Sequence, residues 1–270
     1  MDYLRLLREE RARAKAGAAP APTPASAAPA VAAPVVATPA PAQDEDFHVN
    51  LRLDALEELV PGELYYVNKA IDSDAATKIE AALSRASARF TQLTSRRVAV
   101  FGTAPGGPTD SPKESLPQWL AAMSEALVVA QVFPPGRGPD NVLVNDYALD
   151  GGIMHHTDGP AYDPCVAVLS LGGPTKLTFR PRLRADEIGS RNGAGGGGDV
   201  LSVVLMPNSL LVFRDDKYTR HLHGVSEGVV EDEVDELVAN ASLAGLELGT
   251  RVLRGPRISL TLRHVAVASS

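Results

Sequence analysis

The C-terminal half of the chain has the residue pattern of β-strands. Apolar residues alternate with polar ones or cluster in short runs, which are rich in β-branched and aromatic side chains and are separated by turn residues. An earlier run of the same kind, 64–67, follows the turn pair Pro61 and Gly62. The later runs are 141–147, 166–171, 176–179, 200–205, 210–213 and 258–262. We expect each of them to form a strand.

Two segments before residue 139 have helical spacing instead. The first covers 74–85, where Ile79 and Leu83 lie one turn apart on the side expected to pack inward. Asp72 or Ser73 can cap its N-terminus, because a short polar side chain accepts a hydrogen bond from the free N–H groups there.

The second helix is predicted to begin at Ser115, with Pro117 in its first turn. Its apolar residues at helical spacing are more typical of a core than of a cofactor site; they are Trp119, Leu120, Met123 and Leu127. Helices followed by many short strands predict an α+β, mainly β fold. In this fold, a jelly roll, the N-terminal helices pack on one side of an antiparallel double sheet.

The N-terminal segment has a different composition. Residues 1–15 are good helix formers, but they are too short and too charged for a secretory signal, and their acidic residues are atypical of a transit peptide. A helix that docks on a protein partner is one interpretation, and a solvated helix with frayed ends is the favoured one. Residues 16–43 are mainly alanine and proline, which predicts a disordered tail. We therefore expect a tail over 1–45 and one folded domain over 46–270.

Two segments interrupt the run of strands. Residues 189–198 are rich in glycine but lack the Gly-Lys-Ser/Thr ending of a phosphate-binding loop, so we expect a flexible insertion. Residues 227–247 are acidic, and Val234, Leu237 and Val238 allow a short helix there. A solvated connection is the default interpretation of this second segment.

Composition narrows the function classes only slightly. A hydrophobic content of 44% and a charged content of 22% are ordinary for a soluble globular protein. The net charge of -7 argues against a phosphate-binding surface over the whole chain, although a local basic rim is compatible with it. The single cysteine, Cys165, lies in an apolar run and suits a reducing compartment. No apolar window is long enough for a membrane span. From the lack of a recognisable export signal and the single cysteine, we expect a cytoplasmic or nuclear protein, and by default a monomer.

The chain's candidate chemistry centres on residues 151–158, which end in His156, Thr157 and Asp158. Residues two apart on a strand point to the same face, so this imidazole and this carboxylate can enter one cavity. With one further histidine they would form the facial triad of non-haem Fe(II) oxygenases. A His-x-Asp sequence alone is more often a surface pair.

Three histidines downstream could complete the triad: His221, His223 and His264. We select His223, because the segment that contains it follows an apolar strand and Gly224 gives the backbone freedom beside the site. His221 is the fallback.

Such an iron centre needs an electron donor to activate O2, and the common donor is 2-oxoglutarate, a dianion. One carboxylate chelates iron, and the other needs a cation of matching geometry, which is arginine. Arg257, Ser259, Thr261 and Arg263 share one face of a predicted strand. An arginine-bearing face on an exposed sheet edge explains this pattern equally well.

Residues 90–101 form a polar, basic, strand-prone segment with adjacent Arg96 and Arg97. A segment of this type could close over an anionic substrate. An ordinary solvated hairpin is an equally good interpretation.

Taken together, these motifs resemble the AlkB family of Fe(II)/2-oxoglutarate dioxygenases, in identity and in order. The motifs are Asn145-Asp-Tyr147, His156-Thr-Asp158, His223, and Arg257 followed by Arg263. The closer resemblance is to the branch called AlkB homologue six, and its blocks here are 90–93, 141–145, 158–160, 209–212, 218–220, 223–224 and 259–261. The resemblance covers about 64–265 and is more specific than any single motif.

This resemblance implies a double-stranded β-helix that binds iron through His156, Asp158 and His223. It implies that 2-oxoglutarate is bound by Asn145, Tyr147, Arg257, Ser259 and Arg263. The expected reaction consumes O2, converts 2-oxoglutarate to succinate and CO2, and hydroxylates a substrate methyl group, which leaves as formaldehyde. The expected substrate is an N-methylated base in single-stranded or locally opened RNA or DNA.

The same resemblance makes 90–101 the nucleotide-recognition lid. The candidate substrate residues that follow from it are Phe90, Gln92, Arg96, Arg97, Arg180 and Arg182. Ser259 stands where some relatives carry asparagine. Two alternatives stay open: a protein or small-molecule hydroxylase with the same chemistry, and a nucleic-acid-binding module without catalysis.

Overall fold

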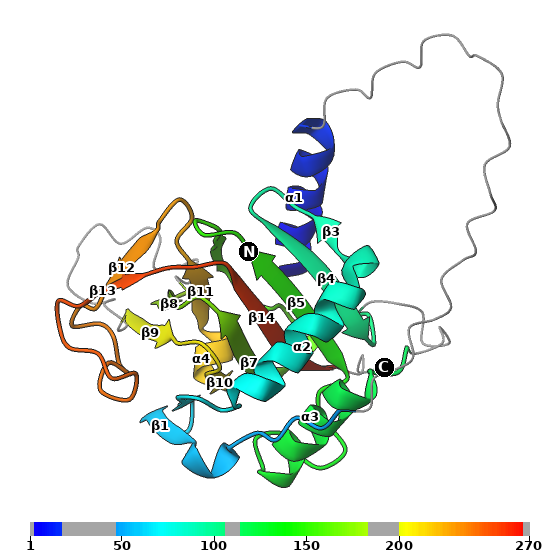
Figure 1. The fold of residues 1–270 in the computed structure, drawn as a ribbon, viewed down its shortest axis with the longest axis horizontal. Helices are drawn as coiled ribbons and strands as arrows, with labels where there is room; N and C mark the ends of the chain where they lie inside the picture. Colours follow the sequence, from blue (N-terminus) through cyan, green and yellow to red (C-terminus); the bar gives the residue numbers. More distant parts are fainter. Residues whose placement is uncertain (1–2, 18–46, 106–113, 183–199, 267–270) are drawn as a thin grey trace, which may run out of the picture.

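The computed structural model describes residues 3–17, 47–105, 114–182 and 200–266 (Figure 1). In the first of these ranges, side chains are described for residues 5–13. The predicted disordered tail at 16–43 falls almost entirely outside the described residues, and the predicted glycine-rich insertion at 189–198 does so completely.

Two antiparallel sheets form the body of the domain. The larger one has eight strands, in the order β1 (Glu57–Val60), β2 (Leu64–Val67), β10 (Leu210–Arg214), β7 (Tyr162–Gly172), β14 (Arg257–Val265), β5 (Asn141–Tyr147), β4 (Arg96–Gly102) and β3 (Thr91–Gln92). The smaller one has four, in the order β6 (Ile153–His156), β11 (His221–Val225), β8 (Thr175–Pro181) and β9 (Leu201–Leu205). From β5 to β11 the chain passes back and forth between the two sheets, which confirms the predicted jelly roll.

Strand β14 lies in the middle of the larger sheet, between β7 and β5. Its apolar face, Ile258, Leu260 and Leu262, contributes to the core under the helices. Its polar face, Arg257, Ser259 and Thr261, lines a cavity between the two sheets. The interpretation of this strand as an exposed edge is therefore wrong, and its period-two pattern is explained by two buried faces of different polarity.

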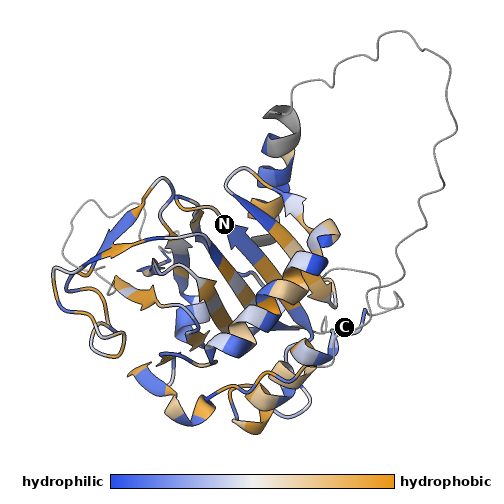
Figure 2. Ribbon diagram, viewed as in Figure 1, coloured by the Kyte–Doolittle hydropathy of each residue, from blue (hydrophilic) through white to orange (hydrophobic). Residues whose placement is uncertain are grey.

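The helices α2 (Ser73–Arg85) and α3 (Gln118–Val129) cover the outer face of the larger sheet (Figure 1). Asp72 caps α2 as predicted, because its Oδ1 accepts a hydrogen bond from the Ala75 N–H at 2.8 Å. Helix α3 begins later than the predicted Ser115, because Pro117 is extended and stands at the N-cap. Figure 2 shows hydrophobic residues along the strands and along α3. Shorter helical segments are η1 (Leu53–Ala55), η2 (Ser87–Arg89) and α4 (Asp216–Thr219).

The acidic segment 227–247 is folded onto the smaller sheet. Its strand β12 (Glu231–Glu233) pairs with β13 (Arg251–Leu253), which follows the segment, and Val234 and Val238 pack against Val204 of β9. The buried Asn240 amide donates to the Val204 carbonyl and its oxygen accepts from the Val204 N–H. The default interpretation as a solvated connection is wrong, and no helix forms around Val234.

The N-terminal helix, α1 (Tyr3–Gly17), packs against the same domain (Figure 1). Leu6, Leu7 and Glu10 are 2%, 8% and 7% exposed. The interpretation as a solvated helix is therefore wrong for this part of α1. Within the described residues, no helix is long and apolar enough to cross a membrane.

The acidic segment offers a test of this packing. Arg254 forms a doubly hydrogen-bonded, buried ion pair with Asp232, with both N···O distances 2.7 Å. Arg254→Ala should lower the free energy of unfolding by about 3 kcal/mol or more, because it leaves a buried carboxylate without its partner. Arg251→Ala, at an exposed position of the same β12–β13 pair, should cost less than about 1 kcal/mol. Urea unfolding of the two variants measures both values, and equal effects would contradict a buried role for Arg254.

Candidate active site

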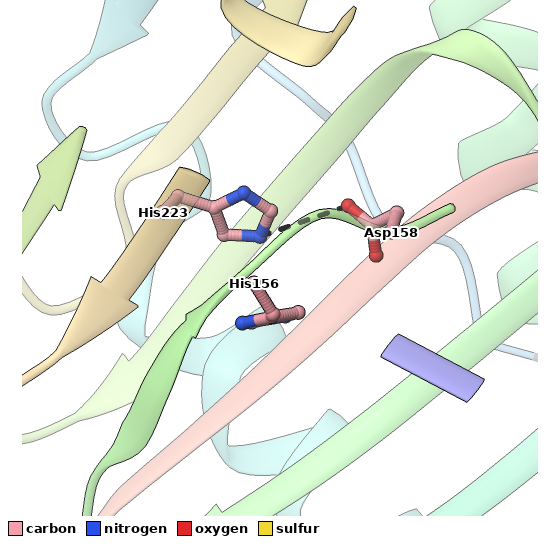
Figure 3. Close-up of side chains that lie close together, drawn as sticks. All are labelled: His156, Asp158 and His223. Atoms are coloured by element: carbon pink, nitrogen blue, oxygen red, sulfur yellow. Dashed lines mark ion pairs between the residues drawn. The ribbon is translucent and has the colours of Figure 1, made fainter. Parts of the chain in front are cut away.

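Three side chains distant in sequence converge between the two sheets. His156 ends β6, Asp158 follows two residues later, and His223 lies on β11 directly opposite His156 in the antiparallel register. Their ligand atoms all lie within 4.8 Å of one another, and the side chains point toward a common centre (Figure 3). Gly224 makes this approach possible, because a Cβ there would lie 2.9 Å from the His155 backbone nitrogen.

The Asp158 carboxylate is buried and held from one side. Its Oδ1 accepts a hydrogen bond from Arg263 Nη1 at 2.7 Å, and Arg263 Nη2 donates to Asn141 Oδ1 at 2.9 Å. Burial alone would raise the Asp158 pKa, but the charge of Arg263, the two histidines and the Arg263 hydrogen bond together outweigh burial, and the pKa is lowered. Oδ2 has no hydrogen-bond partner and lies 3.7 Å from His223 Nε2. One oxygen of an ionised carboxylate is thus directed toward the two histidines.

Both imidazoles are electrostatically suited to bind a metal. Burial, followed by the nearby His223, lowers the pKa of His156 to about 3, and burial lowers the pKa of His223. Neutral imidazole is the form that coordinates metals. His156 Nδ1 donates to the Met154 carbonyl at 2.8 Å, which leaves Nε2 as the nitrogen with the lone pair. Two imidazoles and one carboxylate on a single side are the ligand set of non-haem Fe(II) oxygenases, so these residues fit an iron ion.

The other two candidate histidines are oriented elsewhere. His221 Nδ1 lies 3.0 Å from the Asp216 carbonyl and its Nε2 lies 3.3 Å from Lys217 Nζ. His264 Nδ1 lies 2.8 Å from the Gly138 carbonyl. Neither belongs to the cluster with His156 and Asp158, so the structure favours His223 over the fallback His221.

Next to the triad, two cross-strand pairs carry most of the residues expected to bind 2-oxoglutarate. Arg257 lies opposite Tyr147, and Ser259 lies opposite Asn145, in the pairing of β14 with β5. All four side chains are buried and line the cavity that contains the triad. This register explains how residues more than a hundred positions apart reach one site.

Arg257 is the buried cation of this cavity. Its Nη2 donates to Ser170 Oγ at 3.0 Å, its guanidinium lies 5.5 Å from the Tyr147 ring centre, and its Nε has no hydrogen-bond partner. Burial lowers the Arg257 pKa. A carboxylate bound here would satisfy Nε and offset the buried charge. Ser170 was not predicted, because its only distinguishing feature in the sequence is a hydroxyl in the apolar run 166–171.

Arg263 differs from Arg257, because it does not line the cavity and instead holds the metal-ligand carboxylate of Asp158. Its guanidinium also lies over the Tyr162 ring, 3.9 Å from the ring centre. Its observed contacts are thus those of a residue that orients Asp158.

The structure brings together only some of the six candidate substrate residues. Gln92, Arg96 and Arg97 line a polar cavity of about 500 Å³ that also reaches Tyr147. Phe90 packs against the core under the helices, with the Arg97 guanidinium 5.2 Å from its ring centre. Arg97 pairs with Asp146, and Arg96 is buried against Asn145. Arg180 and Arg182 are exposed at the end of β8 on the smaller sheet.

Comparison with known proteins decides the family. A family model described as the 2OG-Fe(II) oxygenase superfamily matches residues 59–263. The chain belongs to this superfamily. It is therefore a dioxygenase that depends on Fe(II), 2-oxoglutarate and O2, and the site of a 2OG-Fe(II) oxygenase explains why His156, Asp158 and His223 meet beside a buried arginine.

Within the 2OG-Fe(II) oxygenases, the similarity is to the AlkB family, as the order of motifs predicted. "Probable RNA/DNA demethylase ALKBH6" from Danio rerio is 38% identical over 178 residues, which are 66% of this chain and 74% of that protein. The solved structure of OsALKBH1 matches with a TM-score of 0.50 at 18% identity, covering 77% of this chain and 99% of the other. This second similarity supports the fold.

The affinity for a metal ion should distinguish His223 from His221, the other histidine of β11. His223→Ala should weaken Mn²⁺ or anaerobic Fe(II) binding by more than about 100-fold, because loss of a residue that merely orients a ligand already costs roughly 10–100-fold. His221→Ala is the matched control and should leave the affinity unchanged. Titration calorimetry measures both; a larger loss for His221→Ala would show that the triad is wrongly assigned.

Proposed function

We propose that this oxygenase demethylates N-methylated bases of RNA or DNA. The observation that carries the proposal is the buried cavity in which an iron-binding triad lies beside the Arg257 guanidinium. The nucleic-acid part rests on the similarity to a relative named as a probable RNA/DNA demethylase.

Each residue of the cavity has a defined task in this proposal. His156, Asp158 and His223 hold Fe(II), and Arg263 keeps Asp158 ionised and oriented. Arg257 binds the far carboxylate of 2-oxoglutarate through charge-assisted hydrogen bonds, supported by Ser170. Asn145, Tyr147 and Ser259 supply further hydrogen-bonding groups on the same cavity wall.

With Fe(II) bound, the site couples oxidative decarboxylation of 2-oxoglutarate to hydroxylation of a methyl group. One oxygen atom of O2 enters succinate and the other enters the substrate. The resulting N-linked hydroxymethyl group loses formaldehyde, and the nitrogen retains a proton. The buried side chains of this chain exclude water from the reaction and orient both substrates.

The base must leave the stack to reach the triad, because His156 and Asp158 are buried between the sheets. Bases of single-stranded or locally opened nucleic acid require the least energy for this step. The net charge of -7 favours a few local phosphate contacts over a broad basic surface.

The proposal is tested with single-stranded RNA and DNA oligonucleotides that carry different N-methylated bases. The wild-type chain should form succinate and formaldehyde in equal amounts with at least one of them, whereas the unmethylated oligonucleotide of the same sequence should yield no formaldehyde. Asp158→Ala should form neither product above background, because it removes a metal ligand. Succinate formation that no oligonucleotide alters, by a chain that binds iron and 2-oxoglutarate, would contradict the nucleic-acid substrate.

A further inference from the structure

Helix α1 covers a surface that the jelly roll leaves open. The larger sheet has eight strands and the smaller one four, so the smaller sheet does not supply a counterpart for every strand of the larger one. We call β3 and β4, residues 91–102, the lid hairpin. Leu6 and Leu7 of α1 belong to the same apolar cluster as Leu93 and Val98 of this hairpin.

The apolar cluster that contains Leu6 and Leu7 extends to the cavity of the active site. The apolar cluster continues from Leu6 and Leu7 to Leu143 and Ile153, which line that cavity. This cavity is small, about 50 Å³, which is enough space for a few water molecules. A substrate base needs more room than this cavity provides, and none of residues 5–13 of α1 lines it.

A buried ion pair links α1 to the residues expected to bind 2-oxoglutarate. Arg96 Nη1 lies 2.9 and 2.8 Å from the two carboxylate oxygens of Glu10, and Arg96 Nε donates to Asn145 Oδ1 at 2.9 Å. The Arg96 side chain is fully buried and that of Glu10 is 9% exposed. Two hydrogen-bonded steps thus connect α1 with a wall of the catalytic cavity.

A helix that only shielded the lid hairpin from water would not need the Glu10–Arg96 ion pair. Apolar side chains alone would shield Leu93 and Val98, whereas burying a carboxylate and a guanidinium costs desolvation energy. A carboxylate on an arginine is also the contact by which arginine recognises anions, phosphate included. Glu10 therefore occupies an anion-binding group on the inner face of the lid hairpin.

We propose that α1 is an internal competitor of the substrate. Glu10 occupies Arg96 in place of a substrate phosphate, and Leu6 and Leu7 cover the apolar face that the flipped nucleotide would contact. Nucleic acid binds only when α1 leaves. Residues 18–46 connect α1 to the domain, and a chain of this length spans up to roughly 95 Å, which permits departure without unfolding the domain. This inference rests on the proposed nucleic-acid substrate.

The alternative outcome of the test is that α1 helps to bind the nucleic acid. The outer face of docked α1 carries the exposed side chains of Arg8, Arg11 and Arg13. If these residues bind the phosphate backbone while α1 stays docked, then weakening the docking must reduce affinity for nucleic acid. The two roles therefore predict changes of opposite sign for the same variant.

The test compares Glu10→Ala with the matched variant Glu9→Ala in the full-length chain. Glu9 is the neighbouring acid on α1, but its side chain is 36% exposed and pairs with Arg5 at the surface. With a fluorescent, methylated single-stranded oligonucleotide, Glu10→Ala should bind on the order of tenfold more tightly than wild type, because the binding-competent fraction rises. Glu9→Ala should match the wild type. Equal or weaker binding by Glu10→Ala would overturn the proposal.

Hydrogen exchange of the wild-type chain gives a second measurement that needs no variant. Adding the oligonucleotide should accelerate amide exchange in α1, because the helix is displaced. Slower exchange in α1 would show that its arginines bind the nucleic acid, and unchanged exchange would show that α1 is a structural cover; either result overturns the proposal. Tighter binding by Glu10→Ala without formaldehyde release would support this inference while contradicting the proposed demethylation.

Discussion

The site depends on the strand register of the jelly roll, because this register directs polar side chains toward an otherwise apolar interior. Because side chains alternate along a strand, a slip of one residue in β14 would replace Arg257 and Ser259 with Ile258 and Leu260 inside the cavity. The apolar residues of β14 prevent that slip, since they fill the core under α2 and α3. Folding energy from this core thus fixes the positions of groups that would otherwise oppose burial.

The buried charged groups of the site form only some of the hydrogen bonds that they can form. The atoms left without a hydrogen bond lie where ligands are expected. Asp158 uses one carboxylate oxygen for Arg263 and keeps the other without a hydrogen bond. Arg257 uses one nitrogen for Ser170 and leaves Nε without a partner. Buried groups in this state cost free energy, which iron and a dicarboxylate would recover on binding. The observed pairs orient the site, and the unused atoms provide its binding capacity.

Much of this arrangement could be predicted from the sequence because period-two patterns are local. The strands 141–147 and 210–213, the Asp72 cap and the convergence of His156 with His223 all follow from spacing and order. The distinction between His221 and His223 was harder, since it depends on how α4 turns the chain into β11. The preceding apolar strand and Gly224 favour His223, and the family resemblance agrees with that choice.

The errors concern segments whose partners lie far away in the sequence. When α1 is considered alone, the charge of Glu10 indicates a solvated helix. Only the position of Arg96 on β4 explains why Glu10 is buried. The segment 227–247 likewise appears solvated until Asp232 meets Arg254 and Asn240 meets Val204. Charged residues in buried pairs cannot be distinguished from surface residues by composition, because their burial depends on a partner.

The central claim is that one cavity binds iron through the triad and the far end of 2-oxoglutarate through Arg257. Anomalous diffraction from anaerobic crystals grown with Mn²⁺ and 2-oxoglutarate tests it most directly. We predict a single metal peak bounded by His156, Asp158 and His223, with the distal carboxylate on the Arg257 guanidinium. A metal peak elsewhere, or a co-substrate whose distal carboxylate is remote from Arg257, would contradict the account.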